Sequence, residues 1–350
     1  MTEKQATIYD VAAAAGVSIA TVSRVMSGGS VSAASRKKVE SAMAALNYVP
    51  SPSATHRQRR SSTRRLALVI SDLTNPYYAA LSAGAEKEAR KNGYSLQLFS
   101  IPLKSGDSAG TIARLMEEKG IDGAVLVGKI VEEGERVLED LLRLQQVMPL
   151  VTIGPKIEGL NSINITSDLS LSVRMSINHL RALGHQRIAF IGGSSNVRSS
   201  NIRERAFYDE MDRLGLYADR TLHAETGYLP QDGEVCIAKL FARLAPPERP
   251  TALIAINDLV ALGAMRHLQR VGLRIPEDIA IIGCDNQFFT PYLNPALTTV
   301  DLHPEEHGRS AVSELIAARS GTVISYSQVS ECSLIVRESC GAALGYRELG

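Results

Sequence analysis

The chain has 350 residues, 45% of them hydrophobic, which is enough to fill a large core and to form more than one folding unit. Its net charge is +1, yet residues 1–65 hold ten Lys and Arg against three Asp and Glu, so this segment carries +7 and the rest −6. We find no apolar signal-peptide core and no run of about 18 apolar residues, and we expect neither export nor a membrane span. The four cysteines show no metal-ligand spacing, so we expect reduced thiols, a cytoplasmic protein and no metal or cofactor.

Two short helices joined by a tight turn are predicted within residues 7–27. Gly16 permits the left-handed backbone of the turn, and the Ser18 hydroxyl is expected to cap the second helix. Apolar residues repeat at helical spacing on both helices. The inward residues are Ile8, Val11, Ala12 and Ala15 in the first helix and Val22, Val25 and Met26 in the second, whose outward residues are Ile19, Ala20, Ser23 and Arg24. A polar helix presented by such a turn is typical of DNA-binding heads.

A third helix is predicted to begin at Ser32 and to complete a three-helix bundle. Its apolar face holds Val39, Ala42, Met43 and Leu46, and its other face holds Arg36, Lys37 and Lys38. Any small helical bundle would show these stripes, but the glycine turn and the positive charge favour a module for a polyanion. Residues 50–65, rich in Pro, Ser and Arg, are expected to be a linker, either a solvated tether or a segment that orders against phosphates.

After residue 65, short apolar runs alternate with amphipathic segments. Strands are predicted at residues 66–70, 95–99, 123–127, 150–153, 187–191, 252–256 and 279–283, and helices between them at 78–91, 170–183, 203–214, 233–244 and 259–271. This alternation predicts an α/β fold with parallel sheets covered on both faces. About 260 residues is long for one such sheet, so we expect two similar halves.

Several predicted strands run directly into polar residues, and in doubly wound sheets ligands bind at the carboxyl ends of the strands. The residues following strands include Asp72 and Asn75, Asn257 and Asp285. The loops that carry them are therefore expected to converge on one cleft. Asp72, Asn75 and Asn257 could instead cap the helices that follow, whereas no strong helix follows Asp285. Arg203, expected at the start of a helix, is poorly placed for the helix dipole, which favours a separate role.

Motifs along nearly the whole chain resemble one known family. They are TIYDVAAAAGVSIATVSRVMSG, the Tyr48-x-Pro50 step, DLTNPYY, LGHQRIAFIGG, AINDLVALGAM, IPEDIAIIGCDN and NPALTTV, in this order. From Thr7 to about Cys340 the chain is similar to the lactose/galactose repressor (LacI/GalR) family of bacterial transcriptional regulators. The resemblance implies an all-α helix-turn-helix DNA-binding head and a two-lobed, periplasmic-binding-protein-like α/β body with two parallel doubly wound sheets.

The resemblance also implies the domain boundaries. The head spans residues 1–50, the hinge 51–65, the effector-binding and dimerisation body 66–340 and a tail 341–350. The first lobe comprises about 66–165 and 298–325, and the second about 166–297 and 326–340, with the chain crossing near Ile165, Thr298 and Tyr326.

A homodimer is implied that binds a pseudo-palindromic operator, with one recognition helix in each major groove. By position, the DNA-binding set is Thr7, Ser18, Ile19, Ala20, Thr21, Ser23, Arg24, Ala54 and Arg57. Ile19, Ala20 and Arg24 would face base edges, with Arg24 suited to guanine, while Ser18, Thr21 and Ser23 would hold phosphates. Arg57 stands where the family's hinge has a leucine that enters the minor groove, so we expect insertion by charge into a narrow A·T groove instead.

For the effector, the resemblance implies Asp72, Asn75 and Tyr77 in the first lobe, Arg203, Asn257 and Asp285 in the second, and Asp168 at the rim. Three departures leave the ligand open: Leu229 where an aromatic ring often stacks, Ala206 for a glycine and Asn286 for an aspartate. Acceptors opposed by one arginine fit a hydroxyl-rich molecule, so a sugar or sugar derivative is expected first. A nucleobase or nucleoside is the alternative, stacked on Tyr77, Phe288 or Phe289.

The leading hypothesis is thus a transcriptional repressor whose operator affinity depends on a small polar effector. Ligand would close the lobes and change the spacing of two heads that must sit about 34–36 Å apart. A transport-type sugar-binding protein is the second hypothesis, disfavoured by the +7 head. An enzyme such as a dinucleotide-dependent dehydrogenase is the third, disfavoured because Gly192-Gly193-Ser194-Ser195 lacks the G-x-G-x-x-G spacing.

Overall fold

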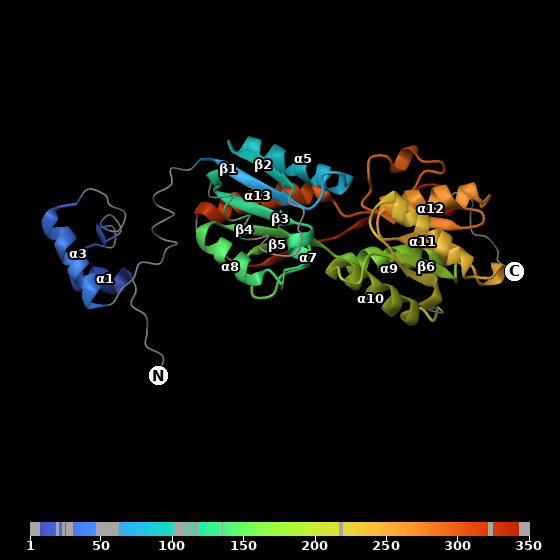
Figure 1. The fold of residues 1–350 in the computed structure, drawn as a ribbon, viewed down its shortest axis with the longest axis horizontal. Coiled ribbons are helices and arrows are strands. Elements are labelled where there is room, and N and C mark those ends of the chain that lie inside the picture. Colours follow the sequence, from blue (N-terminus) through green and yellow to red (C-terminus); the bar gives the residue numbers. More distant parts are fainter. Residues whose placement is uncertain are drawn as a thin grey trace.

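A computed structural model describes residues 8–18, 21–22, 25, 31–46, 63–100, 110, 112, 114, 116, 118–134, 136–216, 220–320 and 325–342. These residues form a small helical head and an α/β body of two lobes that lie side by side (Figure 1). No helix in these ranges has the length and apolar character that crossing a bilayer needs.

The head contains α1 (Ile8–Ala15) and α3 (Ala33–Ala45). Between them along the chain lies a further helical segment, described at residues 21, 22 and 25. Gly16 has φ +62° and ends α1, as the turn prediction required. The Thr21 backbone N–H donates to Ser18 Oγ at 3.2 Å, which confirms the predicted cap of the second helix. The core of the head is formed by Val11, Ala12, Ala15, Val22, Val25, Val39 and Ala42.

The first lobe contains a six-stranded sheet of order β11-β5-β4-β3-β1-β2, in which every described pairing is parallel. Its strands are β1 (Arg65–Ile70), β2 (Ser95–Ser100), β3 (Gly123–Val127), β4 (Leu150–Ile153), β5 (Ile163–Ser167) and β11 (Ser327–Ser330). Its helices include α5 (Pro76–Lys91), α7 (Lys129–Glu132), α8 (Leu138–Val147) and α13 (Pro304–Ser320).

The second lobe repeats this strand order as β12-β10-β9-β8-β6-β7, which confirms two similar halves. Its strands are β6 (Ile188–Gly192), β7 (His223–Glu225), β8 (Ala252–Ala255), β9 (Ala280–Cys284), β10 (Thr298–Asp301) and β12 (Ser333–Ile335). Its helices are α9 (Leu169–Ala182), α10 (Arg198–Arg213), α11 (Pro230–Ala242) and α12 (Asp258–Arg270), with 3₁₀ turns at Arg220–Leu222, Pro246–Glu248 and Thr290–Tyr292. Edge strand β12 pairs antiparallel with β10, so this sheet is mixed rather than purely parallel.

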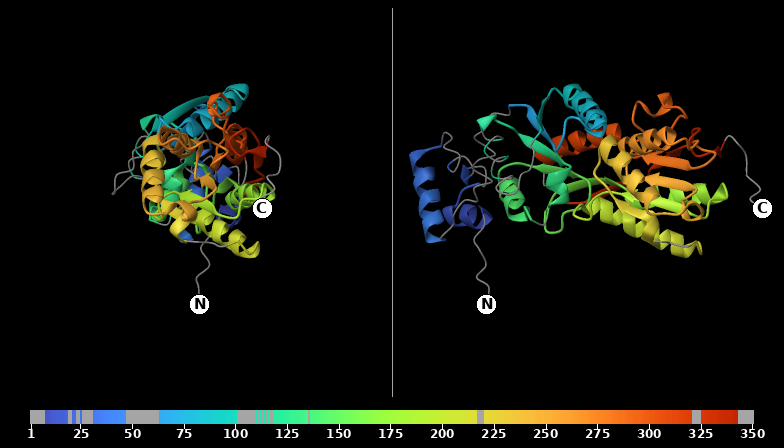
Figure 2. Two further views of the ribbon diagram at one scale, coloured as in Figure 1. Left: turned by 90° about the vertical axis from the view of Figure 1, so that its right-hand side faces the viewer. Right: turned by 45° about the vertical axis from the view of Figure 1, so that its right-hand side comes forward.

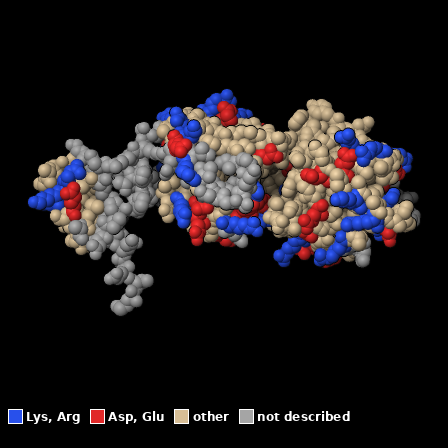
Figure 3. Space-filling model, in the orientation of Figure 1, with Lys and Arg blue, Asp and Glu red and all other residues tan. Residues whose placement is uncertain are grey.

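Helices cover both faces of each sheet (Figures 1 and 2). In β1, Leu66, Leu68 and Ile70 pack in the same core as residues of α5 and α13, while Ala67 and Val69 pack in the core that contains residues of α8. Such strands are buried on both faces, which is why they read as continuous apolar runs. On the face shown in Figure 3, positive and negative side chains are interspersed over both lobes.

The chain crosses between the lobes three times, after β5, after β10 and after β11. The second and third crossings lie further along the chain than predicted. β10 still belongs to the second sheet, because it pairs with β9, and β11 still belongs to the first, because it pairs with β5. The crossing strands are tied together: Ser167 Oγ donates to the Leu302 carbonyl at 3.0 Å, and the Asp168 N–H donates to the Ser330 carbonyl at 3.0 Å.

Candidate functional site

A cavity of about 670 Å³ lies between the two lobes, a volume typical of small-molecule sites. Six of the seven effector residues expected from the sequence line it: Asp72, Asn75, Tyr77, Arg203, Asn257 and Asp285. The wall also contains Ser71, Tyr78, Lys129, Glu132, Glu133, Arg136, Ser199, Tyr228 and His307, together with apolar residues such as Val127, Ile153, Val197 and Leu302. The loops after the strands thus converge as the fold class predicts.

On the first lobe, the wall is built by the loop between β1 and α5. Asn75 caps α5, because its Oδ1 accepts from the Tyr77 N–H at 3.0 Å. Asp72 Oδ1 accepts from both the N–H and the hydroxyl of Thr74, at 2.8 and 2.7 Å. The capping interpretation is therefore correct for Asn75, and the caps also hold both side chains at the cavity.

The rings of Tyr77 and Tyr78 follow this loop and meet edge to face, with their centroids 5.5 Å apart. Burial raises the pKa of Tyr77, and the nearby carboxylate of Asp285 raises it further. Burial also raises the pKa of Tyr78 to about 12, although a hydrogen bond with Ser71 opposes the shift. Both hydroxyls are therefore protonated at neutral pH and can donate hydrogen bonds. Tyr77 of the first lobe and Asp285 of the second thus line the same cavity.

On the second lobe, Arg203 of α10 donates from Nη1 to the Ile256 carbonyl at 3.1 Å. Its Nε is buried and has no hydrogen-bond partner among the described residues. Asn257 caps α12 by accepting from the Val260 N–H at 2.8 Å, and its Nδ2 donates to the Tyr228 carbonyl at 3.1 Å. As with Asn75, a helix cap fixes the orientation of a cavity residue.

Asp285 follows β9 and has φ +106°, a conformation that residues with side chains rarely adopt. The loop is held in place because the Asp285 N–H donates to the Val300 carbonyl at 2.8 Å, and Asp258 Oδ2 accepts from the Gln287 N–H at 2.8 Å. Burial raises the pKa of Asp285 to about 7, although Arg203 and a hydrogen bond with Gln287 favour the ionised form. A strained carboxyl that titrates near neutrality is typical of a functional site.

Hydrogen bonds also connect the lobes directly across the cleft. The Ser199 N–H, at the start of α10, donates to Glu132 Oε2 of α7 at 3.0 Å. Arg198 donates from Nη2 to the Lys156 carbonyl at 2.6 Å and from Nη1 to the Val131 carbonyl at 3.5 Å. These bonds join the N-terminus of α10 to the first lobe.

Four residues considered in the sequence are not among the described residues that line the cavity: Asp168, Leu229, Phe288 and Phe289. Asp168 lies between two lining residues, Ser167 and Leu169, and it caps α9 through the Leu171 N–H and is 3.5 Å from Arg174. Leu229 is 43% exposed, and the aromatic side chain that this loop places in the cavity is Tyr228, one residue earlier. Phe288 is 76% exposed, and neither it nor Phe289 is in the described lining.

Of the expected DNA-binding residues, only Ser18 and Thr21 lie in the described ranges. Their hydroxyls are 2.9 Å apart at the start of the second helix, where Ser18 is exposed and Thr21 is half-buried, and the N-terminus of a helix attracts anions. The remaining seven, Thr7, Ile19, Ala20, Ser23, Arg24, Ala54 and Arg57, lie outside the described residues. Within the described ranges, no group of three or more His, Cys, Asp or Glu side chains could hold a metal ion, and the four cysteines are buried and free.

A helix-turn-helix head joined to a bilobed body with a polar cavity defines a DNA-binding protein that responds to a small ligand. Comparisons with known proteins agree. Residues 7–51 match the bacterial regulatory proteins of the lacI family, and residues 177–340 match the periplasmic binding protein-like domain. The chain is 31% identical over 342 residues to the HTH-type transcriptional repressor CytR of Escherichia coli (strain K12), which covers 97% of this chain and 98% of CytR.

Two solved structures are similar to this chain over nearly its whole length. A complex of the transcriptional regulator CelR with cellobiose has a TM-score of 0.71 at 27% identity, covering 95% of this chain and 99% of CelR. The lac repressor dimer bound to operator and the anti-inducer ONPF has a TM-score of 0.71 at 26% identity, covering 96% and 99%. The chain therefore belongs to the lacI family and is a DNA-binding transcriptional repressor with an effector-binding body, not an enzyme.

Proposed function

We propose that this repressor is controlled by a small, uncharged, hydroxyl-rich effector, a sugar or sugar derivative, bound in the cavity between the lobes. The observation that carries the proposal is the set of polar groups facing one another there. Arg203 and Asp285 from the second lobe oppose Tyr77 and Asn75 from the first. Closing the lobes on such a molecule satisfies groups that would otherwise be buried without partners.

The charge of the lining supports an uncharged ligand. Acidic Asp72, Glu132, Glu133 and Asp285 are balanced against basic Lys129, Arg136 and Arg203. Lys129 is already paired with Glu133 at 3.6 Å. A phosphate or carboxylate ligand would require an excess of positive charge, whereas hydroxyls can donate to carboxylates and accept from the arginine and tyrosines.

A nucleoside is the second candidate, supported by the rings of Tyr77, Tyr78 and Tyr228 in the cavity. These rings provide faces on which a base could stack. Its ribose hydroxyls would meet the same polar groups as those of a sugar. The stacking role expected of Phe288 and Phe289 is not proposed, because neither side chain reaches the described lining.

On DNA, we propose a homodimer that acts in the cytoplasm on a pseudo-palindromic operator at the nucleoid. Ile19, Ala20 and Arg24 contact base edges, and Thr7, Ser18, Thr21 and Ser23 contact the backbone. Ala54 and Arg57 of the hinge approach the minor groove, with Arg57 attracted by its negative potential. Closure of the lobes changes the distance between the two hinges, and with it the fit of the heads to successive major grooves.

A thermal-shift screen with ribose, cellobiose, adenosine, cytidine, guanosine and uridine tests the effector class, because a ligand that binds only the folded state raises the unfolding temperature. Each stabilising compound is then added to the protein on a duplex recovered by selection from a random library. We expect at least one compound to stabilise the protein and to change its affinity for that duplex. Stabilisation by sugars but not nucleosides, or the reverse, decides between the two candidates.

A further inference from the structure

The wall of the cavity includes a buried histidine on the helix that follows the second crossing. His307, on the first turn of α13, is 2% exposed and lines the cavity. Neither Nδ1 nor Nε2 has a hydrogen-bond partner among the described residues. A neutral imidazole has one donor and one acceptor, and buried polar atoms in native proteins are nearly always paired. The ring therefore requires a partner that the described protein atoms do not supply.

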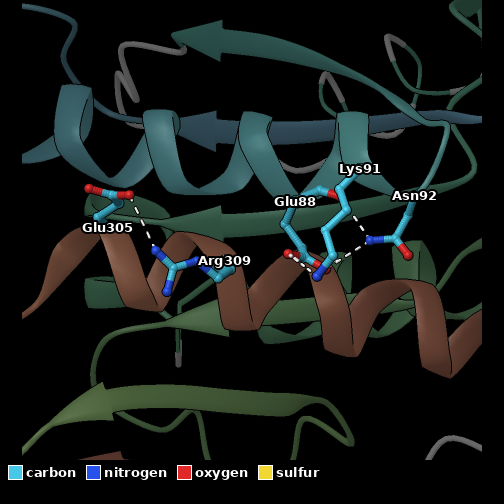
Figure 4. A network of polar contacts seen from close by, with 5 residues as sticks. All are labelled: Glu88, Lys91, Asn92, Glu305 and Arg309. Carbon is cyan, nitrogen blue, oxygen red and sulfur yellow. Dashed lines mark hydrogen bonds and ion pairs between the residues drawn. The ribbon is translucent and has the colours of Figure 1, made fainter.

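The backbone that carries His307 has little freedom to move it elsewhere, because α13 packs very closely on α5, as the two helices in Figure 4 show. A Cβ at Gly84 of α5 would lie 1.9 Å from the Glu305 carbonyl oxygen, and one at Gly308 would lie 2.0 Å from the Leu81 carbonyl oxygen. The residues two before and one after His307 are thus in direct backbone contact with α5. The contact fixes the position of the ring at the cavity.

The surroundings of the ring determine what it can bind. Burial, together with the nearby His303, lowers the pKa of His307 to about 4, while Glu306 and Asp301 oppose the shift. The imidazole is therefore neutral at physiological pH. A neutral ring both donates and accepts, so it suits a hydroxyl or an amide-like edge and gives no charge stabilisation to a phosphate or carboxylate.

We propose that His307 is an effector contact that determines specificity, and that one of its ring nitrogens exchanges a hydrogen bond with a hydroxyl or a base edge of the bound molecule. This inference rests on the proposed function, since it concerns the same cavity. His307 belongs to the first lobe and lies five residues after Leu302, at the crossing segment. A ligand held by His307 on one side and by Arg203 and Asp285 on the other would bridge the two lobes.

The test compares His307→Leu and His307→Gln with wild type and with His267→Leu as the matched control. His267 lies on α12 outside the described lining of the cavity. The probes are the six sugars and nucleosides of the screen. For each probe that stabilises wild type, we expect His307→Leu to weaken binding at least tenfold in calorimetry, His307→Gln to weaken it less, and His267→Leu to leave it unchanged. Without probe, His307→Leu should unfold at the same or a higher temperature, because it removes two unpaired polar atoms.

The outcomes separate the two proposals. If no probe stabilises the wild-type protein, the proposed effector class is wrong, and the role of His307 falls with it. If wild type binds a probe and His307→Leu binds it equally well, the proposed function stands and the inference is overturned. A lower unfolding temperature of the probe-free His307→Leu variant would also overturn it, since the ring would then be making stabilising bonds already. Nitrogen NMR of the labelled histidine rings gives an independent readout, in which the probe should shift the His307 signals.

Discussion

Replacing Asp285 by asparagine should stabilise the protein at high pH while impairing its response to effector. Asn has nearly the same shape and tolerates positive φ, but it carries no charge. The pKa of Asp285 moves from an ordinary 3.8 to about 7 on folding. Above pH 7 the ionised carboxyl therefore opposes folding by about 4 kcal/mol, and at pH 5 by less than half of that. For an acid with a raised pKa, stability is fully present below pH 3.8 and is lost as pH rises to about 7.

The assay is thermal and denaturant unfolding of wild type and Asp285→Asn at pH 5 and pH 8, without ligand. We expect the difference in unfolding free energy between the two proteins to be clearly larger at pH 8. Asp209→Asn is the control, because Asp209 is an exposed carboxylate on α10 with 74% of its side chain accessible. A difference in unfolding free energy that is the same at both pH values, or larger at pH 5, would show that burial does not raise the pKa of the Asp285 carboxyl.

The same carboxyl predicts how effector affinity depends on pH. A hydroxyl that donates to ionised Asp285 favours the charged form, so binding releases a proton when the free pKa is about 7. Effector affinity should therefore weaken by about tenfold from pH 8 to pH 6. Calorimetry in buffers of different ionisation enthalpy measures the released proton directly, and Asp285→Asn should release none from this site. Affinity that rises as the pH falls would contradict this role.

Three further predictions concern the cleft and the head. Arg198→Ala removes two hydrogen bonds between the lobes and should weaken effector binding about three- to thirtyfold in calorimetry. Arg205→Ala, on the exposed side of α10, is the control and should not weaken binding. Equal effector affinities of wild type and Arg198→Ala would show that closure does not depend on Arg198. Ser18→Ala removes a helix cap and should lower the stability of the head by about 0.5–2 kcal/mol, measured by circular dichroism. It should also weaken operator binding, measured by fluorescence anisotropy. Unchanged stability and unchanged affinity would exclude the capping role and the DNA-binding role of Ser18. Arg57→Ala should reduce operator affinity, and it should reduce the slope of log affinity against log salt concentration by the equivalent of about one phosphate contact. An unchanged salt dependence would show that Arg57 does not contact the DNA.

The central strands could be predicted from sequence because burial on both faces requires unbroken apolar runs. β1 and β3 have this character, and their predicted positions agree with the structure to within one residue. The predicted set lacks five strands. β7, β11 and β12 are short and only partly buried, and β5 and β10 are buried but mix apolar with polar residues, so no long apolar run marks any of them. The lobe boundaries were misplaced for the same reason, since the polar strand β11 decides where the third crossing lies.

The cavity residues that follow strands were predictable, because the carboxyl ends of parallel strands meet at one edge. Asn257 and Asp285 belong to this group. His307 could not be found in this way: it lies on a helix, and only the close packing of α13 on α5 brings it to the cavity. The position of Tyr228 in the cavity, one residue before Leu229, depends on loop conformation, which no periodicity in the sequence records.

In the proposed function, occupancy of the cavity between the lobes controls the affinity of the head for DNA. The most direct measurement is the affinity of the purified protein for its selected operator duplex, followed by fluorescence anisotropy with and without a probe that binds wild type. We expect the probe to change operator affinity at least tenfold in wild type and to have little effect in Asp285→Asn. The contrary result would be a probe that binds wild type but not Asp285→Asn in calorimetry and yet leaves the operator affinity of wild type unchanged.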